Sequence, residues 1–174
     1  MTPYATFHGI RFFNCYATDL TSELKEGVLA LWRRSGILPR NADPEKRIKQ
    51  LVLAAVTAEG AVIGVNTVYP GQFVPQPDGY APVDCLFYRT FIEPAGRRPQ
   101  MMRAMLEHAY AILHNVHSGQ KGPRALAIVT ENLSLTRRGT VRTMNRLGWR
   151  TECSLPDGKM LLVRPFREGG AEQS

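Results

Sequence analysis

The sequence predicts a mixed α/β fold in a single domain, and two observations lead to this prediction. The chain has 174 residues, which is enough for one domain with a sizeable core and hardly enough for two. Its periodic segments follow one another in the order strand, two helices, three strands, helix, strand, helix, two strands. We expect one domain over residues 1–167 and a disordered tail at 168–174, where no large apolar residue could anchor the chain.

Each element is assigned from its periodicity and from the turn residues beside it. Residues 7–18 are rich in aromatic and β-branched residues, which favours one strand. In residues 19–36, apolar side chains recur at helical spacing from Leu24, and Gly36 fits a C-cap. The remaining predicted elements are a short helix at 45–50, a hairpin over 51–69 around Glu59-Gly60, a loop at 70–82, strands at 83–92 and 124–132, helices at 98–117 and 135–148, and a hairpin over 149–166 around Pro156-Asp157-Gly158.

The junction between the predicted strand 83–92 and the next helix carries Gly96, Arg97 and Arg98. The first N–H groups of a helix have no partner within the helix, so such a junction can hold an anion. The net charge of +7 suits an anionic ligand, although it could equally serve solubility. Two solvated surface arginines are the alternative interpretation, but cations at a helix start oppose the helix dipole.

This element order, with a basic strand–loop–helix junction at its centre, resembles the GNAT superfamily of acyl-CoA N-acyltransferases over roughly residues 8–166. Residues 92–97, Ile-Glu-Pro-Ala-Gly-Arg, are similar to the start of the family's junction motif. Asn132 and Gly148-Trp149 resemble its second signature, with Trp in place of Phe. The resemblance implies a mixed, mostly antiparallel sheet of six to seven strands flanked by about four helices, with strands 83–92 and 124–131 parallel neighbours.

The sequence departs from the family pattern in two places. The family's six-residue phosphate signature falls on residues 97–102, where only Arg97 matches and Gln100 and Met102 replace two glycines. Many members carry a general-acid Tyr four residues before the closing glycine, and here that residue is Met144. These departures imply a reshaped or weakened cofactor loop and a missing acid.

The resemblance implies acetyl-CoA or another acyl-CoA as cosubstrate. Its pyrophosphate would lie at the start of the helix, with Gly96 giving the chain freedom to turn and the two arginines supplying charge for phosphate oxygens. The residues that we expect at the cofactor are Phe91, Ile92, Gly96, Arg97, Arg98, Gln100, Met101, Met102, Asn132, Arg137 and Arg138.

Acyl transfer to an amine also needs a base for the ammonium proton and an acid for the departing thiolate. Asp84 lies in an apolar strand after the Pro-rich loop, where a carboxylate could have a raised pKa and act as the base; an ion pair with an arginine is the alternative. Glu93 is the second candidate base. Tyr88 could serve as the acid or pack in the core, and Asn132 could hold a substrate amide or cap a turn.

A run of arginines lies between residues 137 and 150. Arg138, Arg142 and Arg146 recur every four residues and so form one cationic face of a helix. This face could bind the cofactor's ribose phosphate, contact a nucleic acid, or pair with carboxylates elsewhere in the fold.

The composition bears on redox state and location. The three cysteines are far apart in sequence and form no CxxC pair, which favours a reducing cytoplasm over a disulfide framework or a zinc site. His114 and His117 share a helix face, but no third residue has metal-ligand spacing, so we expect no metal site. No apolar run approaches the roughly 20 residues that span a bilayer, and the N-terminus lacks the pattern of a signal peptide.

We therefore expect an N-acyltransferase, most simply an acetyltransferase, in which the amine attacks the thioester directly. The acceptor amine could belong to a small molecule, a peptide or a nucleic acid, and the chain could form a homodimer. The alternatives are a basic protein that binds or modifies nucleic acid, and a CoA-binding member of the family without catalytic activity.

Overall fold

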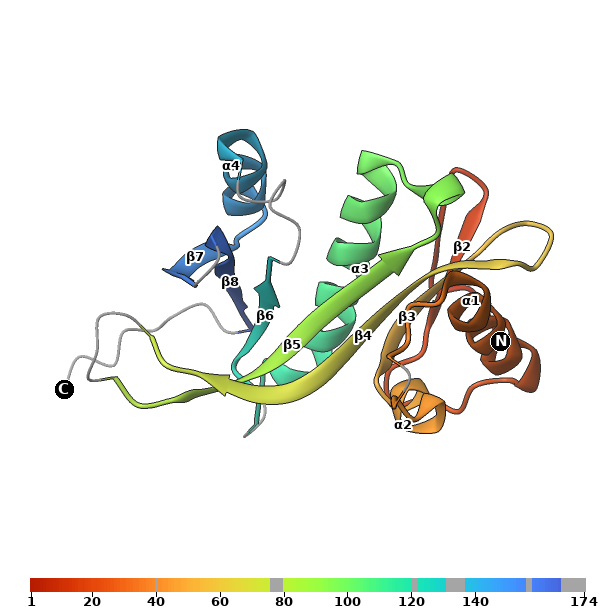
Figure 1. The fold of residues 1–174 in the computed structure, drawn as a ribbon, viewed down its shortest axis with the longest axis horizontal. Helices are drawn as coiled ribbons and strands as arrows, with labels where there is room; N and C mark the ends of the chain where they lie inside the picture. The colour runs from red at the N-terminus through yellow and green to blue at the C-terminus, as the bar shows by residue number, and fades with distance from the viewer. Residues whose placement is uncertain (40, 76–79, 120–121, 131–136, 156–157, 167–174) are drawn as a thin grey trace. The chain divides into compact units, whose positions relative to one another are not determined.

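The computed structural model describes residues 1–39, 41–75, 80–119, 122–130, 137–155 and 158–166 (Figure 1). By their internal contacts these residues form two compact units. Unit 1 comprises Met1–Val68 and Arg89–Leu113, and unit 2 comprises Tyr69–Tyr88 and the described residues from His114 onward. That residues 1–167 fold as one domain stays a prediction, and 168–174 lie outside the described residues.

The structure contains eight strands, four α-helices and a 3-10 turn among its described residues. They are β1 (Ala5–Phe7), β2 (Ile10–Asn14), α1 (Ser22–Ser35), α2 (Pro44–Ile48), β3 (Leu51–Val56), β4 (Val62–Phe73), β5 (Val83–Ile92), η1 (Pro94–Gly96), α3 (Pro99–His117), β6 (Ala125–Val129), α4 (Arg138–Arg146), β7 (Arg150–Ser154) and β8 (Met160–Pro165). No helix in the described part of the chain has both the length and the apolar character needed to cross a membrane.

The strand order is β1-β2-β3-β4-β5-β6-β8-β7. Neighbouring strands from β1 to β4 are antiparallel, and so are β6 with β8 and β8 with β7. The pair β5 and β6 is parallel, with Cys85–Phe87 opposite Ala125–Ala127. The predicted mixed, mostly antiparallel α/β sheet is therefore confirmed, and so is the parallel pairing of these two strands.

The sheet has eight strands rather than the six to seven predicted, because the expected first strand is a hairpin. His8 and Gly9 both have positive φ, 48° and 79°, between β1 and β2. Two consecutive residues with positive φ are typical of a type I′ turn, whose twist matches antiparallel strands. Gly9 adopts this conformation without strain, whereas His8 is a less common residue there.

In unit 1, helices cover both faces of the sheet, as the strand register shows. Phe13, Ala54 and Val65 lie opposite one another on β2, β3 and β4, and they pack in one cluster with buried residues of α1. Their neighbours, Phe12, Ala55 and Gly64, point to the other face. All six residues of β3 are buried, as expected for a strand that is covered on both sides.

On that second face, α3 lies close to β4 because Gly64 has no side chain. A Cβ at Gly64 would lie 3.1 Å from Sδ of the buried Met105 and 3.3 Å from the Phe91 carbonyl oxygen. The Asn66 side chain donates a hydrogen bond to the Met105 carbonyl oxygen at 3.4 Å. His108 contacts the rings of Tyr4 and Phe12, and burial lowers the pKa of this histidine.

In unit 2, a separate apolar cluster joins the end of β4 to the start of β5 and to β6 and β8. Its buried members include Phe73, Cys85, Ala127 and Val163. Residues 70–73, which were predicted to be loop, are strand, so that part of the prediction is wrong. Burial of Phe73 explains the difference, because it outweighs the turn preference of Pro70 and Gly71.

Candidate functional site

The junction between β5 and α3 is a tight turn within unit 1. The chain passes from Ile92 through the 3-10 turn Pro94–Gly96 to the first residue of α3, Pro99. The Gly96 N–H donates to the Glu93 carbonyl at 2.8 Å, and the Arg97 N–H donates to the Pro94 carbonyl at 3.2 Å. These two N–H groups are therefore used within the turn and are not free to bind an anion.

Both arginines of the junction are exposed, and one of them is anchored. Arg97 donates from Nε to the Ile92 carbonyl at 2.8 Å, and its guanidinium lies 5.9 Å from the centre of the Phe91 ring. No described residue accepts a hydrogen bond from its terminal nitrogen atoms. Arg97 is thus held by one nitrogen and can offer the others to a ligand, and Arg98 is a second exposed cation beside it.

The first turn of α3 offers fewer backbone donors than an ordinary helix start. The N–H groups of Met101 and Met102 donate to the Arg98 carbonyl at 3.0 and 3.2 Å. Pro99 has no N–H. Among the described residues, none accepts from the N–H of Gln100. An anion here would meet this N–H and the guanidinium groups rather than a ring of backbone amides.

Gly96 is required for close packing rather than for an unusual turn. Its φ is not in the positive region, contrary to the conformational freedom expected from the sequence. A Cβ at this position would lie 3.3 Å from Cδ1 of Ile63 and 3.4 Å from Cγ2 of Ile92. The side chains of Ile92 and Met101, both predicted at the cofactor, are buried, whereas Gln100 and Met102 are exposed.

Glu93 forms a salt bridge with an arginine of α1. Arg34 donates from Nε and Nη2 to the two carboxylate oxygens of Glu93, at 2.8 and 3.1 Å. The same Nη2 donates to the Val62 carbonyl at 2.6 Å. The hydrogen bonds and charge of Arg34 hold the pKa of Glu93 below its usual range, so Glu93 is a weak base. Sequence reasoning missed Arg34, because nothing distinguishes it from the adjacent Arg33 at the helix end.

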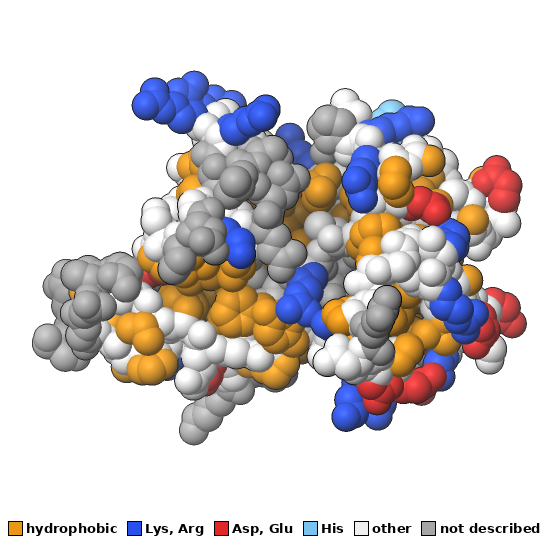
Figure 2. Space-filling model, viewed as in Figure 1, with side chains coloured by type: hydrophobic (Ala, Val, Ile, Leu, Met, Phe, Trp, Pro, Cys, Tyr) orange, Lys and Arg blue, Asp and Glu red, His pale blue; other side chains and the backbone are white. Residues whose placement is uncertain are grey.

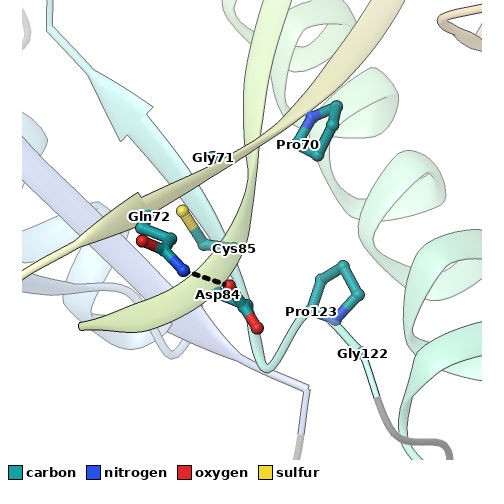
Figure 3. Close-up of a pocket in the computed structure, with 7 residues that line it drawn as sticks. All are labelled: Pro70, Gly71, Gln72, Asp84, Cys85, Gly122 and Pro123. Atoms are coloured by element: carbon teal, nitrogen blue, oxygen red, sulfur yellow. Dashed lines mark hydrogen bonds between the residues drawn. The ribbon is translucent and has the colours of Figure 1, made fainter. Parts of the chain in front are cut away.

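Asp84 lines a separate pocket, which lies wholly within unit 2 (Figure 3). The pocket has a volume of about 370 Å³, and its lining residues are Pro70, Gly71, Gln72, Asp84, Cys85, Gly122 and Pro123. Gln72 donates from Nε2 to Oδ1 of Asp84 at 2.8 Å. The carboxylate is exposed rather than enclosed by apolar residues, and its partner is an amide rather than an arginine. Gln72 was missed because it lay in the predicted loop.

The other candidate catalytic residues differ in their accessibility. The Cys85 side chain is 1% exposed, and burial, with a contribution from the charge of Asp84, raises its pKa to about 11. It is therefore poorly suited to form a thiolate nucleophile. Tyr88 is buried in unit 2. Met144 is half-buried in α4 and its thioether has no proton to donate, while Asn132 lies outside the described residues.

The arginines of α4 form an exposed basic face, which Figure 2 shows as Lys and Arg side chains gathered over this helix. In the described part of the chain, Arg137, Arg138, Arg142 and Arg146 have no ion pair. Arg150, outside the helix, pairs with Glu152 at 3.3 Å. Pairing with internal carboxylates, one of the three interpretations of this run, therefore applies only to Arg150 among the described residues.

Comparison with solved structures identifies the class of fold. A GCN5-related N-acetyltransferase from Kribbella flavida superposes with a TM-score of 0.55 at 17% identity, covering 90% of this chain and 98% of that one. AtaT complexed with acetyl-methionyl-tRNAfMet gives 0.56 at 14%, covering 87% and 93%. A point mutant of the AtaT toxin, bound to the C-terminus of the antitoxin AtaR and acetyl-CoA, gives 0.55 at 14%, covering 91% and 94%.

The chain therefore has the fold of the GNAT acyl-CoA N-acyltransferases, as its resemblance to that family implied. No protein-family model and no curated protein sequence matches it. At these identities the likeness describes the fold, and the activity has to be argued from the residues.

Proposed function

We propose that this protein is an N-acetyltransferase that moves an acetyl group from acetyl-CoA to an amine. The observation that carries the proposal is the acyltransferase fold, matched over about nine tenths of the chain. The β5–α3 junction supports it, because Arg97 and Arg98 are exposed at the point where the sequence resembles the family's pyrophosphate-binding motif.

The junction residues fit an anionic cosubstrate, with a changed balance of donors. Arg97 and Arg98 would hold the pyrophosphate by charge-assisted hydrogen bonds, and the N–H of Gln100 would add one backbone donor. The hydrogen bond from Arg97 to the Ile92 carbonyl keeps one guanidinium in place before the ligand arrives. Arginine side chains would thus replace much of the binding that glycine-rich loops achieve with backbone amides.

Acetyl-CoA supplies a thioester, and the protein has to position an amine beside it and manage two protons. We propose direct attack: the amine nitrogen bonds to the carbonyl carbon, the carbon–sulfur bond breaks and the thiolate departs. Asp84 is our candidate to hold the acceptor ammonium and take its proton. Tyr88 or a water molecule would return a proton to the thiolate, which is a tolerable leaving group because thiols have a pKa near 8.5. An acyl-cysteine route is disfavoured, since Cys85 is buried with a raised pKa.

The acceptor amine could belong to a small molecule, a peptide or a nucleic acid. The similarity to AtaT complexed with acetyl-methionyl-tRNAfMet supports the third of these classes as a second candidate, in which the amine is carried by RNA. Acetyl-CoA and the free cysteines both fit a reaction in a reducing cytoplasm, which is where we propose that it occurs. A CoA-binding protein without catalytic activity is the alternative, and an acetyl-transfer assay distinguishes it from the enzyme. That the chain forms a homodimer stays a prediction.

Thermal unfolding with acetyl-CoA tests the proposal. A ligand that binds only the folded state raises the melting temperature by mass action. We expect such a rise. The paired change Arg97→Ala and Arg98→Ala should weaken the binding of acetyl-CoA by about 1–3 kcal/mol, the scale of hydrogen bonds to charged groups, and so reduce the rise. Arg33→Ala with Lys46→Ala, which removes two exposed charges of unit 1, is the matched control and should keep the full rise. An unchanged melting temperature at millimolar acetyl-CoA would count against the proposal.

A further inference from the structure

The basic face of α4 has a regular geometry. Arg138, Arg142 and Arg146 are all exposed, and each is four residues from the next. Four residues of α-helix rise by about 6 Å, so the three guanidinium groups follow a line about 12 Å long on one side of the helix. We call these three arginines the basic face of α4; Figure 2 shows basic side chains gathered over this helix.

Nothing in the described chain compensates for this concentration of charge. Like charges four residues apart on a helix repel each other. The first turn of α4 contains no acidic residue, and no side chain caps the helix at Arg137. No residue of the helix is fully buried; Val141 and Met144 are half-buried, whereas the three arginines are exposed, so core packing does not explain the arginines. An external anion would relieve the repulsion.

We propose that the basic face of α4 binds the phosphate backbone of a nucleic acid. A single phosphate group would engage one or two of these arginines, whereas a line of three suits an anion that repeats along its length. All three residues are arginines, whose planar guanidinium groups match phosphate oxygens with two parallel hydrogen bonds. The helix has no aromatic residue for stacking on bases, so binding is to the backbone and is tolerant of sequence.

This inference rests on α4 alone and does not require that the protein transfer an acetyl group. If both proposals hold, the acceptor amine is carried by the bound nucleic acid. If only this one holds, the protein binds nucleic acid without modifying it.

Fluorescence anisotropy with a labelled RNA hairpin tests the proposal. The affinity should fall with salt, and the logarithmic slope reflects the number of phosphates neutralised, at about 0.7–0.9 per contact. Replacing Arg138, Arg142 and Arg146 together with glutamine should therefore reduce the slope by about 2–3. Between 50 and 200 mM salt, three such contacts account for an affinity loss of about 20- to 40-fold, which the triple variant should no longer show.

Two control variants separate this surface from a general effect of charge. Arg33→Gln with Lys46→Gln and Lys49→Gln removes an equal number of exposed charges from α1, α2 and the residue after α2, and should leave the slope nearly unchanged. Lys at the three α4 positions keeps the charge and should retain most of the slope. Equal loss of binding in the α1–α2 control would overturn the proposal, as would an unaltered slope in the α4 glutamine variant.

The wild-type protein and the α4 variants also show whether the basic face binds a ligand other than nucleic acid. If polyglutamate displaces the labelled hairpin as effectively as unlabelled hairpin does at equal concentration of charge, the face has no preference for phosphate and the proposal is wrong. If the α4 glutamine variant loses its acetyl-CoA-dependent rise in melting temperature, these arginines bind the cofactor and the proposal is again wrong. Failure of the acetyl-CoA rise in the wild-type protein, with RNA binding intact, would count against the proposed enzyme only. Circular dichroism should show unchanged helix content in the α4 variant, since the replaced side chains have no ion pair among the described residues.

Discussion

The salt bridge between Arg34 and Glu93 should contribute measurably to the stability of unit 1. Replacing Arg34 by Ala removes two hydrogen bonds to the Glu93 carboxylate and one to the Val62 carbonyl. The Arg34 side chain is 41% exposed and that of Glu93 is 27% exposed, so solvent screens the pair and it should contribute about 1 kcal/mol despite its two-bond geometry. The bond to Val62 should add about 1 kcal/mol.

The expected loss is therefore about 2 kcal/mol, which for a chain of this length lowers the melting temperature by about 4–8 °C. Thermal unfolding followed by circular dichroism measures it. Arg33→Ala is the matched control: its guanidinium is 3.7 Å from Glu26, and both side chains are about two thirds exposed, so it should cost under about 0.5 kcal/mol. Equal melting temperatures for Arg34→Ala and Arg33→Ala would show that the contacts of Arg34 with Glu93 and Val62 do not stabilise the protein as we expect.

The pH dependence of stability gives a second test of the Arg34–Glu93 salt bridge. The folded-state pKa of Glu93 lies below its unfolded value, so its contribution is present above the unfolded pKa of about 4.3 and is lost as the pH falls through the folded pKa. Glu93→Gln should therefore be less stable than wild type at pH 7 and should approach it in strongly acidic solution. A constant difference across this range would show that the charge of Glu93 contributes nothing.

Three further outcomes follow from other positions. Gly27→Ala should destabilise the protein by about 1 kcal/mol, because a Cβ there would lie 2.7 Å from Cγ2 of Val62 on β4. Gly139→Ala in α4 meets open space and should raise the stability by about 0.5–1 kcal/mol, because alanine favours the helix more than glycine does. Thermal unfolding of the two variants measures both changes. Iodoacetamide at pH 8 should alkylate the half-buried Cys153 long before Cys85, whose pKa is raised to about 11, and mass spectrometry of the peptides would show the reverse order if this is wrong. Asp84→Asn should lower the turnover number and flatten its pH profile in an acetyl-transfer assay, and an unaltered profile would remove Asp84 as the proposed base.

Much of the fold could be predicted because its signals are local. The helix α1 is capped by Gly36, with φ of 60°, as its sequence indicated, and β5 has the bounds that its apolar run predicted. The hairpin at His8 was missed because a histidine with positive φ has no reliable sequence signal. The end of β4 was missed because the burial of Phe73 depends on contacts with residues distant in sequence.

The candidate site was harder to predict, since its geometry depends on backbone hydrogen bonds. The basic residues of the junction were apparent from the sequence. That the Arg98 carbonyl accepts two of the N–H groups expected to face an anion was not, because it depends on how the chain enters α3. The roles of Arg34 and Gln72 likewise come from partners 59 and 12 residues away.

No residue of α4 is fully buried, and this has a consequence for the local unfolding of the helix. A helix of nine residues is too short to be stable alone in water, and its like charges weaken it further. Its apolar residues are at most half-buried, whereas α3 has several fully buried ones, so α4 should unfold locally at a lower free energy and its amide hydrogens should exchange with solvent earlier than those of α3. A bound polyanion would slow this exchange, so hydrogen–deuterium exchange at α4 would report occupancy of its basic face without any label on the ligand.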